Sequence, residues 1–437
     1  MQGLSLALVI FMDKQSYSLT KVLTQQLRWS ALAVPMAVVT GSLVALFLWL
    51  LDRVTIFRWQ QPWLLFLLPI AGILIYFLYQ FAAKRVEQGN SLIISEINEP
   101  GNGVPGRMAP VVLLATLITH LFGGSAGREG TAVQMGGSLA ALLSRWMKLS
   151  RADVRILLIC GIAAGFGAVF GTPFAGAIFA LEALSVGLFR IRTLRSAGIL
   201  SYEAFIPCLV AGLVADVTCS AYGIHHTIYQ VTTTLPNSVT GTFIHFNWMI
   251  AGKTLLAGVF FGLAAWLFIF LTHSIKDISA RLVKKKWLVP FIGGLLVIGL
   301  AVALGTRDYL GLGVLNPSPD GVSIVSAFHN GGSETFSWFW KILFTAITIG
   351  MGFKGGEVTP LFFIGATLGN TLAIVAGAPV DLFAALGFIA VFAGATKTPF
   401  ACMVMGVELF GGGPIIYYAL ACAVAFYCSG SRGIYSK

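Results

Sequence analysis

Residues 171–182 read GTPFAGAIFALE, and residues 396–408 read TKTPFACMVMGVE. The shared Thr-Pro-Phe-Ala core and the glutamate that ends each stretch recur 226 residues apart. Upstream, GREGTAVQMGG at 127–137 pairs with GGEVTPLFFIG at 355–365, with glutamate, threonine and glycine matching 228 residues apart. Two motifs that recur in the same order at nearly the same offset indicate a tandem of two related halves.

The repeat divides the chain into four predicted segments. The halves are expected at residues 25–215 and 248–437, joined by an extracellular connecting loop at 216–247. Residues 1–24 are predicted to form an amphipathic segment on the cytoplasmic side. Related halves of membrane proteins commonly meet near the bilayer midplane, where broken helices form a binding site.

Composition assigns the chain to the membrane class. Of 437 residues, 57% are hydrophobic and 10% are charged, whereas a soluble domain carries roughly 25% charged residues. Apolar runs of about 20 residues, the length that crosses a bilayer, recur along the chain. They include 29–51, 63–83, 249–270 and 287–304. We therefore predict an all-α, polytopic protein embedded in a lipid bilayer.

The distribution of basic residues predicts the orientation. Lys and Arg are absent from 196–252, and cytoplasmic loops are the ones that carry an excess of these residues. The N-terminus and the basic segments are therefore expected in the cytoplasm, with multi-pass insertion in the inner (plasma) membrane. The net charge of +11 alone could suggest that the protein binds nucleic acid. The sequence shows no soluble domain with a stripe of aromatic and basic residues, so nucleic acid is not an expected partner. The basic segments are 14–28, 84–85, 145–155, 190–195 and 276–286.

Cysteine and histidine spacing gives no sign of a metal site or a cofactor. The six cysteines show no CxxC pattern and lie mostly in apolar runs, as small buried side chains do. The six histidines include one adjacent pair, His225 and His226, and no HxxxH pattern. No cofactor and no metal are expected.

Each half carries a glycine-rich break before an apolar run, GGSAGREGT at 123–131 and GFKGGEVTP at 352–360. A helix that begins there directs its free N–H groups and its positive dipole end into the protein, which suits an anion. The alternative is that these glycines only allow helices to pack closely. That alternative leaves unexplained the carboxylate in the middle of each break.

Ionisable side chains at membrane depth are costly and mark functional sites. Glu129 and Glu357 lie within the two breaks and are the candidate proton-handling and gating residues. Glu182 and Glu408 end their apolar runs, so we interpret them as helix caps or interface residues. Lys397 is expected to snorkel or to bond backbone carbonyls.

Three collinear stretches, at 124–131, 163–182 and 388–410, together resemble the CLC family of chloride channels and transporters. The resemblance implies an inverted-repeat fold with broken helices that meet at the midplane. It also implies a transporter or channel, not an enzyme, and a homodimer with one pathway per subunit.

The resemblance assigns roles to residues on both sides of the break in the first half. GREG carries the family's gating glutamate, here Glu129, which competes with the anion and accepts a proton when it swings away. Its neighbours Gly127, Arg128 and Gly130 are implied to contribute to anion binding. A tyrosine near the C-terminus that reaches the central anion would be Tyr435.

Departures from the family pattern point to a subgroup. The serine-bearing GSGIP motif of chloride members is placed at 89–93, which reads GNSLI, so Asn90 and Ser91 are the candidate anion ligands. GNGVP at 101–105 is interpreted as the following loop. The GxFxP motif of the second half is replaced by GEVTP, with Val358 and Thr359 as candidate ligands.

The internal proton glutamate of chloride exchangers is replaced by Ala183. Together these departures resemble the fluoride-exporting branch, which exchanges fluoride for protons. Fluoride is small and strongly hydrated, and the Asn90 amide and the Thr359 and Tyr435 hydroxyls are hydrogen-bond donors. Donors alone do not establish selectivity. Thr359 could instead bond a helical carbonyl, and Asn90 could cap a helix.

The predicted function is therefore export of fluoride in exchange for protons. A chloride/proton exchanger or a passive anion channel on the same scaffold is the nearer alternative. A proton-coupled cation carrier is the more distant one, since only 17 acidic residues occur and most lie in loops.

Overall fold

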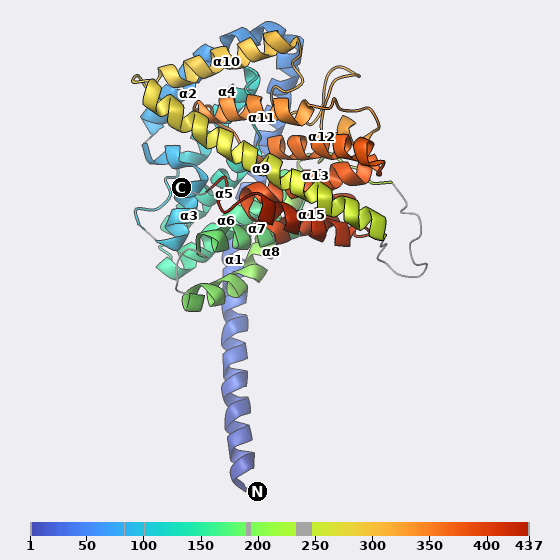
Figure 1. The fold of residues 1–437 in the computed structure, drawn as a ribbon. Coiled ribbons are helices and arrows are strands. Elements are labelled where there is room, and N and C mark those ends of the chain that lie inside the picture. The colour runs from blue at the N-terminus through green and yellow to red at the C-terminus, as the bar shows by residue number, and fades with distance from the viewer. Residues whose placement is uncertain (1, 83, 100, 189–193, 233–246, 436–437) are drawn as a thin grey trace.

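The computed structural model describes residues 2–82, 84–99, 101–188, 194–232 and 247–435 (Figure 1). Within these ranges the chain is helical and forms no strand, which confirms the all-α prediction. In chain order the elements are α1 Gln2–Gln60, η1 Pro62–Leu67, α2 Leu68–Ala82, η2 Lys84–Gln88, α3 Asn90–Asn98, α4 Met108–Leu121, α5 Glu129–Trp146, α6 Arg151–Phe170, α7 Pro173–Leu188, α8 Leu194–Ala221, α9 Trp248–Leu282, α10 Leu288–Leu304, η3 Ser326–Phe328, α11 Ser337–Gly350, α12 Val358–Ala376, α13 Val380–Thr396, α14 Pro399–Phe410 and α15 Ile415–Cys428.

Six helices among the described residues are long and apolar enough to cross a membrane, which agrees with a multi-pass protein. Their apolar side chains also cover the outside of the molecule, where Leu46, Phe81, Val217 and Leu256 are exposed. Such a surface suits lipid, because a soluble protein rarely leaves broad apolar patches facing water. The six spans are Val22–Gln60, Pro62–Phe81, Arg151–Phe170, Ala204–Ala221, Trp248–Leu282 and Val358–Ala376.

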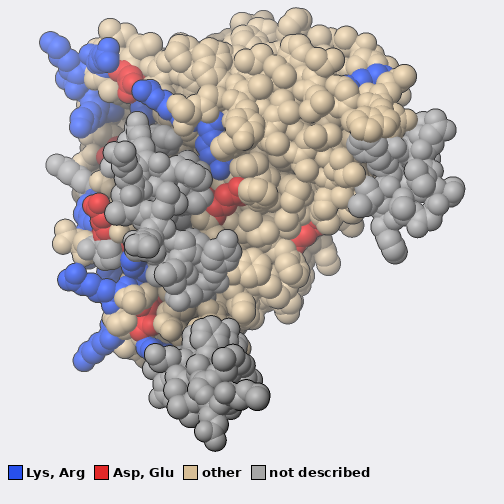
Figure 2. Space-filling model, turned by 60° about the horizontal axis from the view of Figure 1, so that its bottom comes forward, with Lys and Arg blue, Asp and Glu red and all other residues tan. Residues whose placement is uncertain are grey.

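At one edge of the molecule, basic residues from distant parts of the sequence form ion pairs and hydrogen bonds with neighbouring helices. The Arg28 guanidinium donates to the Asp153 carboxylate at 2.7 Å, at the start of α6. Arg155 donates to a backbone carbonyl of α3 at 2.6 Å, and Arg85 pairs with Glu96 on that same helix at 2.8 Å. Figure 2 shows Lys and Arg gathered mainly along one edge of the face in view, beside a broad surface with few charges.

The two halves pack their helices in the same way. In the first half a Cβ on Gly136 of α5 would lie 2.0 Å from the Gly161 carbonyl oxygen of α6. In the second half a Cβ on Gly365 of α12 would lie 2.0 Å from the Gly387 oxygen of α13. Each pair of backbones is therefore in direct contact, and only glycine fits between them. These helices carry the two glycine-rich breaks, so their close packing fixes where the breaks lie.

The repeated glutamates join one half to the other. The Glu182 carboxylate on α7 accepts from the N–H groups of Phe400 and Ala401 at 3.1 and 2.8 Å. Reciprocally, Glu408 on α14 accepts from the first N–H groups of α7 at 3.0 and 2.8 Å. Each carboxylate thus satisfies free N–H groups at the other helix's N-terminus, which confirms that both are caps.

The predicted segment boundaries stay predictions. Helix α1 continues without a break through residue 25, and α8 extends to Ala221. Residues 233–246 of the expected connecting loop lie outside the described residues, as do residues 190–193 of the basic segment 190–195. The motif GNGVP lies in the loop between α3 and α4, which confirms that interpretation.

Replacing Gly365 by alanine should destabilise the protein, because the added methyl group meets a backbone oxygen that cannot move alone. Overpacking of this kind costs about 1–3 kcal/mol. Gly299→Ala on α10 is the matched control, since a Cβ there meets nothing within 4 Å. In detergent thermal-unfolding scans the midpoint should fall for Gly365→Ala and stay level or rise for Gly299→Ala. Equal midpoints would show that the contact between α12 and α13 is looser than described.

Candidate functional site

The N-terminal ends of α5 and α12 meet inside the molecule. Gly127 and Gly356 exchange two backbone hydrogen bonds, with N···O distances of 2.5 and 2.7 Å. A Cβ on Gly356 would lie 2.8 Å from the Gly130 nitrogen and one on Gly127 2.9 Å from the Gly356 oxygen. The glycines of both breaks therefore allow the two chain segments to touch, and the free N–H groups of two helices point into one place.

A single carboxylate occupies this place. Glu129, the first residue of α5, is 1% exposed. One of its carboxylate oxygens accepts from the N–H groups of Arg128 and Thr359, each at 3.0 Å. The other accepts from the Thr359 hydroxyl. The carboxylate oxygens thus stand where a small anion would be held, since the donors come from both helix ends.

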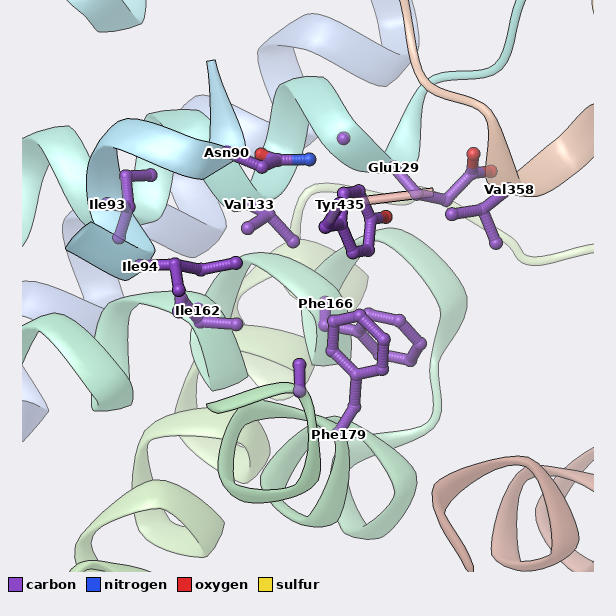
Figure 3. A pocket seen from close by; sticks show the side chains of 12 residues that line it. Asn90, Ile93, Ile94, Glu129, Val133, Ile162, Phe166, Phe179, Val358 and Tyr435 are labelled. Atoms are coloured by element: carbon purple, nitrogen blue, oxygen red, sulfur yellow. The ribbon is translucent and has the colours of Figure 1, made fainter. Parts of the chain in front are cut away.

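Glu129 also lies between two cavities. The first, the Asn90 cavity, has about 20 Å³ of space for water-sized molecules and lies on one side of the carboxylate (Figure 3). It is lined by Asn90, Ile93, Ile94, Glu129, Gly130, Val133, Ile162, Phe166, Phe179, Ala183, Val358 and Tyr435. The second, the His226 cavity, has a similar volume. It is lined by Arg128, Glu129, Phe170, His226, Thr227, Tyr229, Val314, Thr359, Phe362, Phe388 and Leu409. Each volume accommodates about one water molecule or a small ion.

Polar groups of the Asn90 cavity gather near Glu129. Asn90 is the first residue of α3, it lines this cavity together with Tyr435, and its Oδ1 atom is buried without a hydrogen-bond partner. Gly89 precedes it with φ +57°, a left-handed conformation that glycine adopts without strain and that starts the helix here. Farther from Glu129 the lining is apolar, with the rings of Phe166 and Phe179 stacked at a centroid distance of 4.6 Å.

Tyr435 reaches the cavity because the chain after α15 is anchored. The Ile434 N–H donates to the Ala395 carbonyl at 2.8 Å. Beside it, the Lys397 ammonium group donates to the Ser429 hydroxyl at 2.6 Å and to the Gly430 carbonyl at 2.5 Å. The expectation that Lys397 bonds backbone carbonyls is confirmed, and its contacts hold the segment that leads to Tyr435.

Some of the predicted site residues line one of the two cavities, and others line neither. Gly130 and Val358 line the Asn90 cavity, and Arg128 and Thr359 line the His226 cavity. Ser91 is half-buried and lines neither. Glu357 precedes α12 and also lines neither, although its Oε2 would lie 3.6 Å from a Cβ on Gly130. The functional roles of all these residues stay predictions.

The sequence analysis missed two parts of the site. One is the apolar lining from α6 and α7, including Phe166, because a phenylalanine in an apolar run carries no distinguishing signal. The other is His226, which was recognised only as one member of a histidine pair. Its position next to the break in the first half depends on how the chain after α8 folds back.

Comparison with known proteins agrees with this geometry. A family model described as "Voltage gated chloride channel" matches residues 70–430. The chain belongs to this family. A "Chloride/fluoride channel protein" of Pseudomonas syringae pv. tomato is 44% identical over 414 residues, covering 93% of this chain and 85% of the relative.

Solved structures of family members share the fold. A crystal structure of a CLC-type fluoride/proton antiporter matches with TM-score 0.82 and 34% identity, covering 93% of this chain and 96% of that chain. A slow cyanobacterial Cl⁻/H⁺ antiporter matches with TM-score 0.72 at 19% identity, covering 93% and 96%, and so shows the fold alone. The predicted CLC-like fold with broken helices is confirmed.

The chain end that carries Tyr435 should loosen when Lys397 is replaced by methionine. The variant removes the donor to Ser429 and Gly430, and a buried acceptor left unpaired costs about 1–3 kcal/mol. Amide hydrogen exchange at residues 429–435 should therefore speed up roughly tenfold, since 1.4 kcal/mol corresponds to one factor of ten. Lys253→Met is the control, because the half-buried Lys253 bonds one carbonyl far from this segment, that of Gly377. Unchanged exchange in Lys397→Met would show that the segment is held by other contacts.

Proposed function

We propose that the protein exports fluoride in exchange for protons. The similarity to a CLC-type fluoride/proton antiporter over 93% of the chain supports this function, as does the 44% identity with a protein named for chloride and fluoride. The observation that carries the proposal is the Glu129 carboxylate, which accepts three hydrogen bonds at the meeting point of two helix ends and separates two cavities.

The proposed orientation has the Asn90 cavity on the cytoplasmic side. Helix α6 starts at the basic edge with Arg151, and positive-inside bias assigns that edge to the cytoplasm. Along α6, Ile162 and Phe166 line the Asn90 cavity, whereas the last residue, Phe170, lines the His226 cavity. The His226 cavity then faces the outside, and Glu129 closes the path between the two.

Exchange follows from competition for the same donors. The Glu129 carboxylate is held by charge-assisted hydrogen bonds, which contribute about 1.5–3 kcal/mol each. When a proton binds to the carboxylate, the negative charge is lost and the donors hold the group less tightly. The protonated Glu129 side chain then leaves the helix ends. Fluoride then takes the vacated N–H and hydroxyl donors. When the proton is released to the other side, the carboxylate returns and expels the anion. One anion thus moves one way as one proton moves the other.

The donor set near Glu129 suits a small, strongly hydrated anion. Fluoride loses its water only where short, firm donors replace it, and here the Thr359 hydroxyl, Asn90 amide and Tyr435 hydroxyl are all available. The backbone N–H of Thr359 adds a donor that is fixed by the helix. Chloride, which is larger and less strongly hydrated, gains less from such donors.

We propose Glu357 as the proton acceptor on the cytoplasmic side. In chloride exchangers that role falls to a glutamate at the position of Ala183, and here that position contributes a methyl group to the cavity wall. Among the described residues that line the Asn90 cavity, Glu129 has the one carboxylate. Glu357 lies just behind Gly130 and is near enough for its charge to act on Glu129.

We also propose a homodimer in the inner membrane, with the N-terminus in the cytoplasm and one pathway in each subunit. Family membership and the apolar surface support this arrangement. A chloride/proton exchanger is the alternative outcome of the transport experiments.

Glu129→Gln should abolish proton coupling, because an amide cannot carry the proton. In liposomes loaded with fluoride and monitored with a fluoride electrode and a pH probe, wild-type protein should take up protons in proportion to the fluoride released. The variant should release fluoride with less than about a tenth of the wild-type proton flux, a factor equivalent to 1.4 kcal/mol. The exposed Glu99→Gln serves as control. If Glu129→Gln kept the wild-type proton coupling, the exchange scheme would be contradicted. If the wild-type protein carried more chloride than fluoride, the chloride/proton exchanger would be favoured.

Asn90→Ser should weaken the preference for fluoride over chloride. The serine hydroxyl is shorter than the amide and withdraws a donor from the cavity. Loss of one hydrogen bond to a charged ligand costs about 1.5–3 kcal/mol, so the fluoride-to-chloride flux ratio should fall roughly tenfold or more. Ser95→Ala, which changes an exposed residue of α3 outside the cavity lining, should leave the ratio unchanged. An unchanged ratio in Asn90→Ser would remove Asn90 from the selectivity site.

A further inference from the structure

The His226 cavity holds a titratable ring that the exchange scheme does not use. His226 lines the same cavity as Glu129, and its Nε2 atom is buried without a hydrogen-bond partner. The Asp216 carboxylate at the end of α8 lies 3.7 Å from that nitrogen. The ring also packs directly against the backbone of Gly171, where an added Cβ would lie 2.5 Å from the His226 Cδ2 atom.

Other groups around the cavity are less suited to passing protons. The lining also includes Arg128 and Tyr229, but arginine and tyrosine as residue types exchange protons far above neutrality, whereas an ordinary histidine side chain does so between about pH 5 and 8. From α12 and α13, the side chains that line the cavity are uncharged. The titratable and charged groups near His226 are Asp216 and Cys219 of α8, Arg128, Glu129, Tyr229 and, next to Asp216, Glu408 of α14.

We propose that His226 is the outer proton relay to Glu129, with Asp216 as the residue that positions it. This inference rests on the proposed function. External water protonates the imidazole, which then has a carboxylate within ion-pair distance. The imidazolium gives that proton, through a water molecule in the cavity, to a carboxylate oxygen of Glu129. The imidazole is then neutral again, and the protonated Glu129 is free to leave the helix ends.

The space agrees with this step. The cavity has space for at least one water molecule, which in the proposed relay bridges the ring and the carboxylate. The remaining walls are mostly apolar, including Phe170, Phe362 and Phe388, and they leave few other sites for water. A relay matters most where external protons are scarce, because near pH 5 hydronium supplies Glu129 without help.

The test is the dependence of proton-coupled fluoride flux on external pH, in liposomes with fixed internal pH. His226→Gln should be slower than wild type by about tenfold or more near pH 7.5, since positioned proton donors contribute at least that much. The deficit should close as the external pH approaches 5, with the ratio of protons to fluoride unchanged. The neighbouring, exposed His225→Gln should match wild type throughout. The flux of Asp216→Asn near pH 7.5 should lie between that of His226→Gln and that of wild type.

A rescue experiment separates relay from packing. His226→Gly should regain flux near pH 7.5 when imidazole is added outside, whereas His225→Gly should not respond. A wild-type pH profile in His226→Gln, or an equal loss at every external pH without rescue, would overturn the relay. If wild-type protein moves protons with chloride instead of fluoride, the fluoride proposal is overturned but the relay is not. The His226 and His225 variants are then compared with wild type in chloride. Wild-type protein that moves no protons overturns both.

Discussion

The structure depends on one constraint: an anion in the middle of a membrane protein must find hydrogen-bond donors there. Backbone N–H groups at the ends of broken helices supply such donors. The Arg128 guanidinium, 3.6 Å from the Glu129 carboxylate, adds a positive charge beside them. Bringing two such ends together requires the backbones at Gly127 and Gly356 to touch, and no side chain fits between them. The glycine contacts between α5 and α6 and between α12 and α13 hold those ends in place.

The same donors explain why one carboxylate can act as a gate. An unpaired charge in an apolar interior is prohibitively costly, so the Glu129 carboxylate is stable there only while it accepts from Arg128 and Thr359. An incoming anion needs those donors as well. Proton and anion are therefore linked at Glu129 through a single shared set of hydrogen bonds.

Much of the architecture could be predicted from local sequence. The repeated motifs located the two breaks and the cap glutamates, because each depends on residue type and spacing along one helix, and composition alone gave the membrane class. Side-chain direction was less accessible. Ser91 and Asn90 are neighbours, yet the structure turns Asn90 alone into the cavity. His226 and Phe166 gain their positions from contacts between distant segments, which no single-sequence pattern contains. The placement of Tyr435 near Asn90 followed only from the family resemblance.

The most direct test of the account is proton uptake on fluoride binding. Calorimetric titration of the purified protein in buffers of different ionisation enthalpy gives the number of protons taken up per fluoride bound. If fluoride displaces the Glu129 carboxylate, wild type should take up as much as about one proton per fluoride near neutral pH, by proton linkage. Glu129→Gln should take up none and bind fluoride more tightly. Fluoride binding to wild type without proton uptake, or weaker binding in Glu129→Gln, would contradict competition for shared donors.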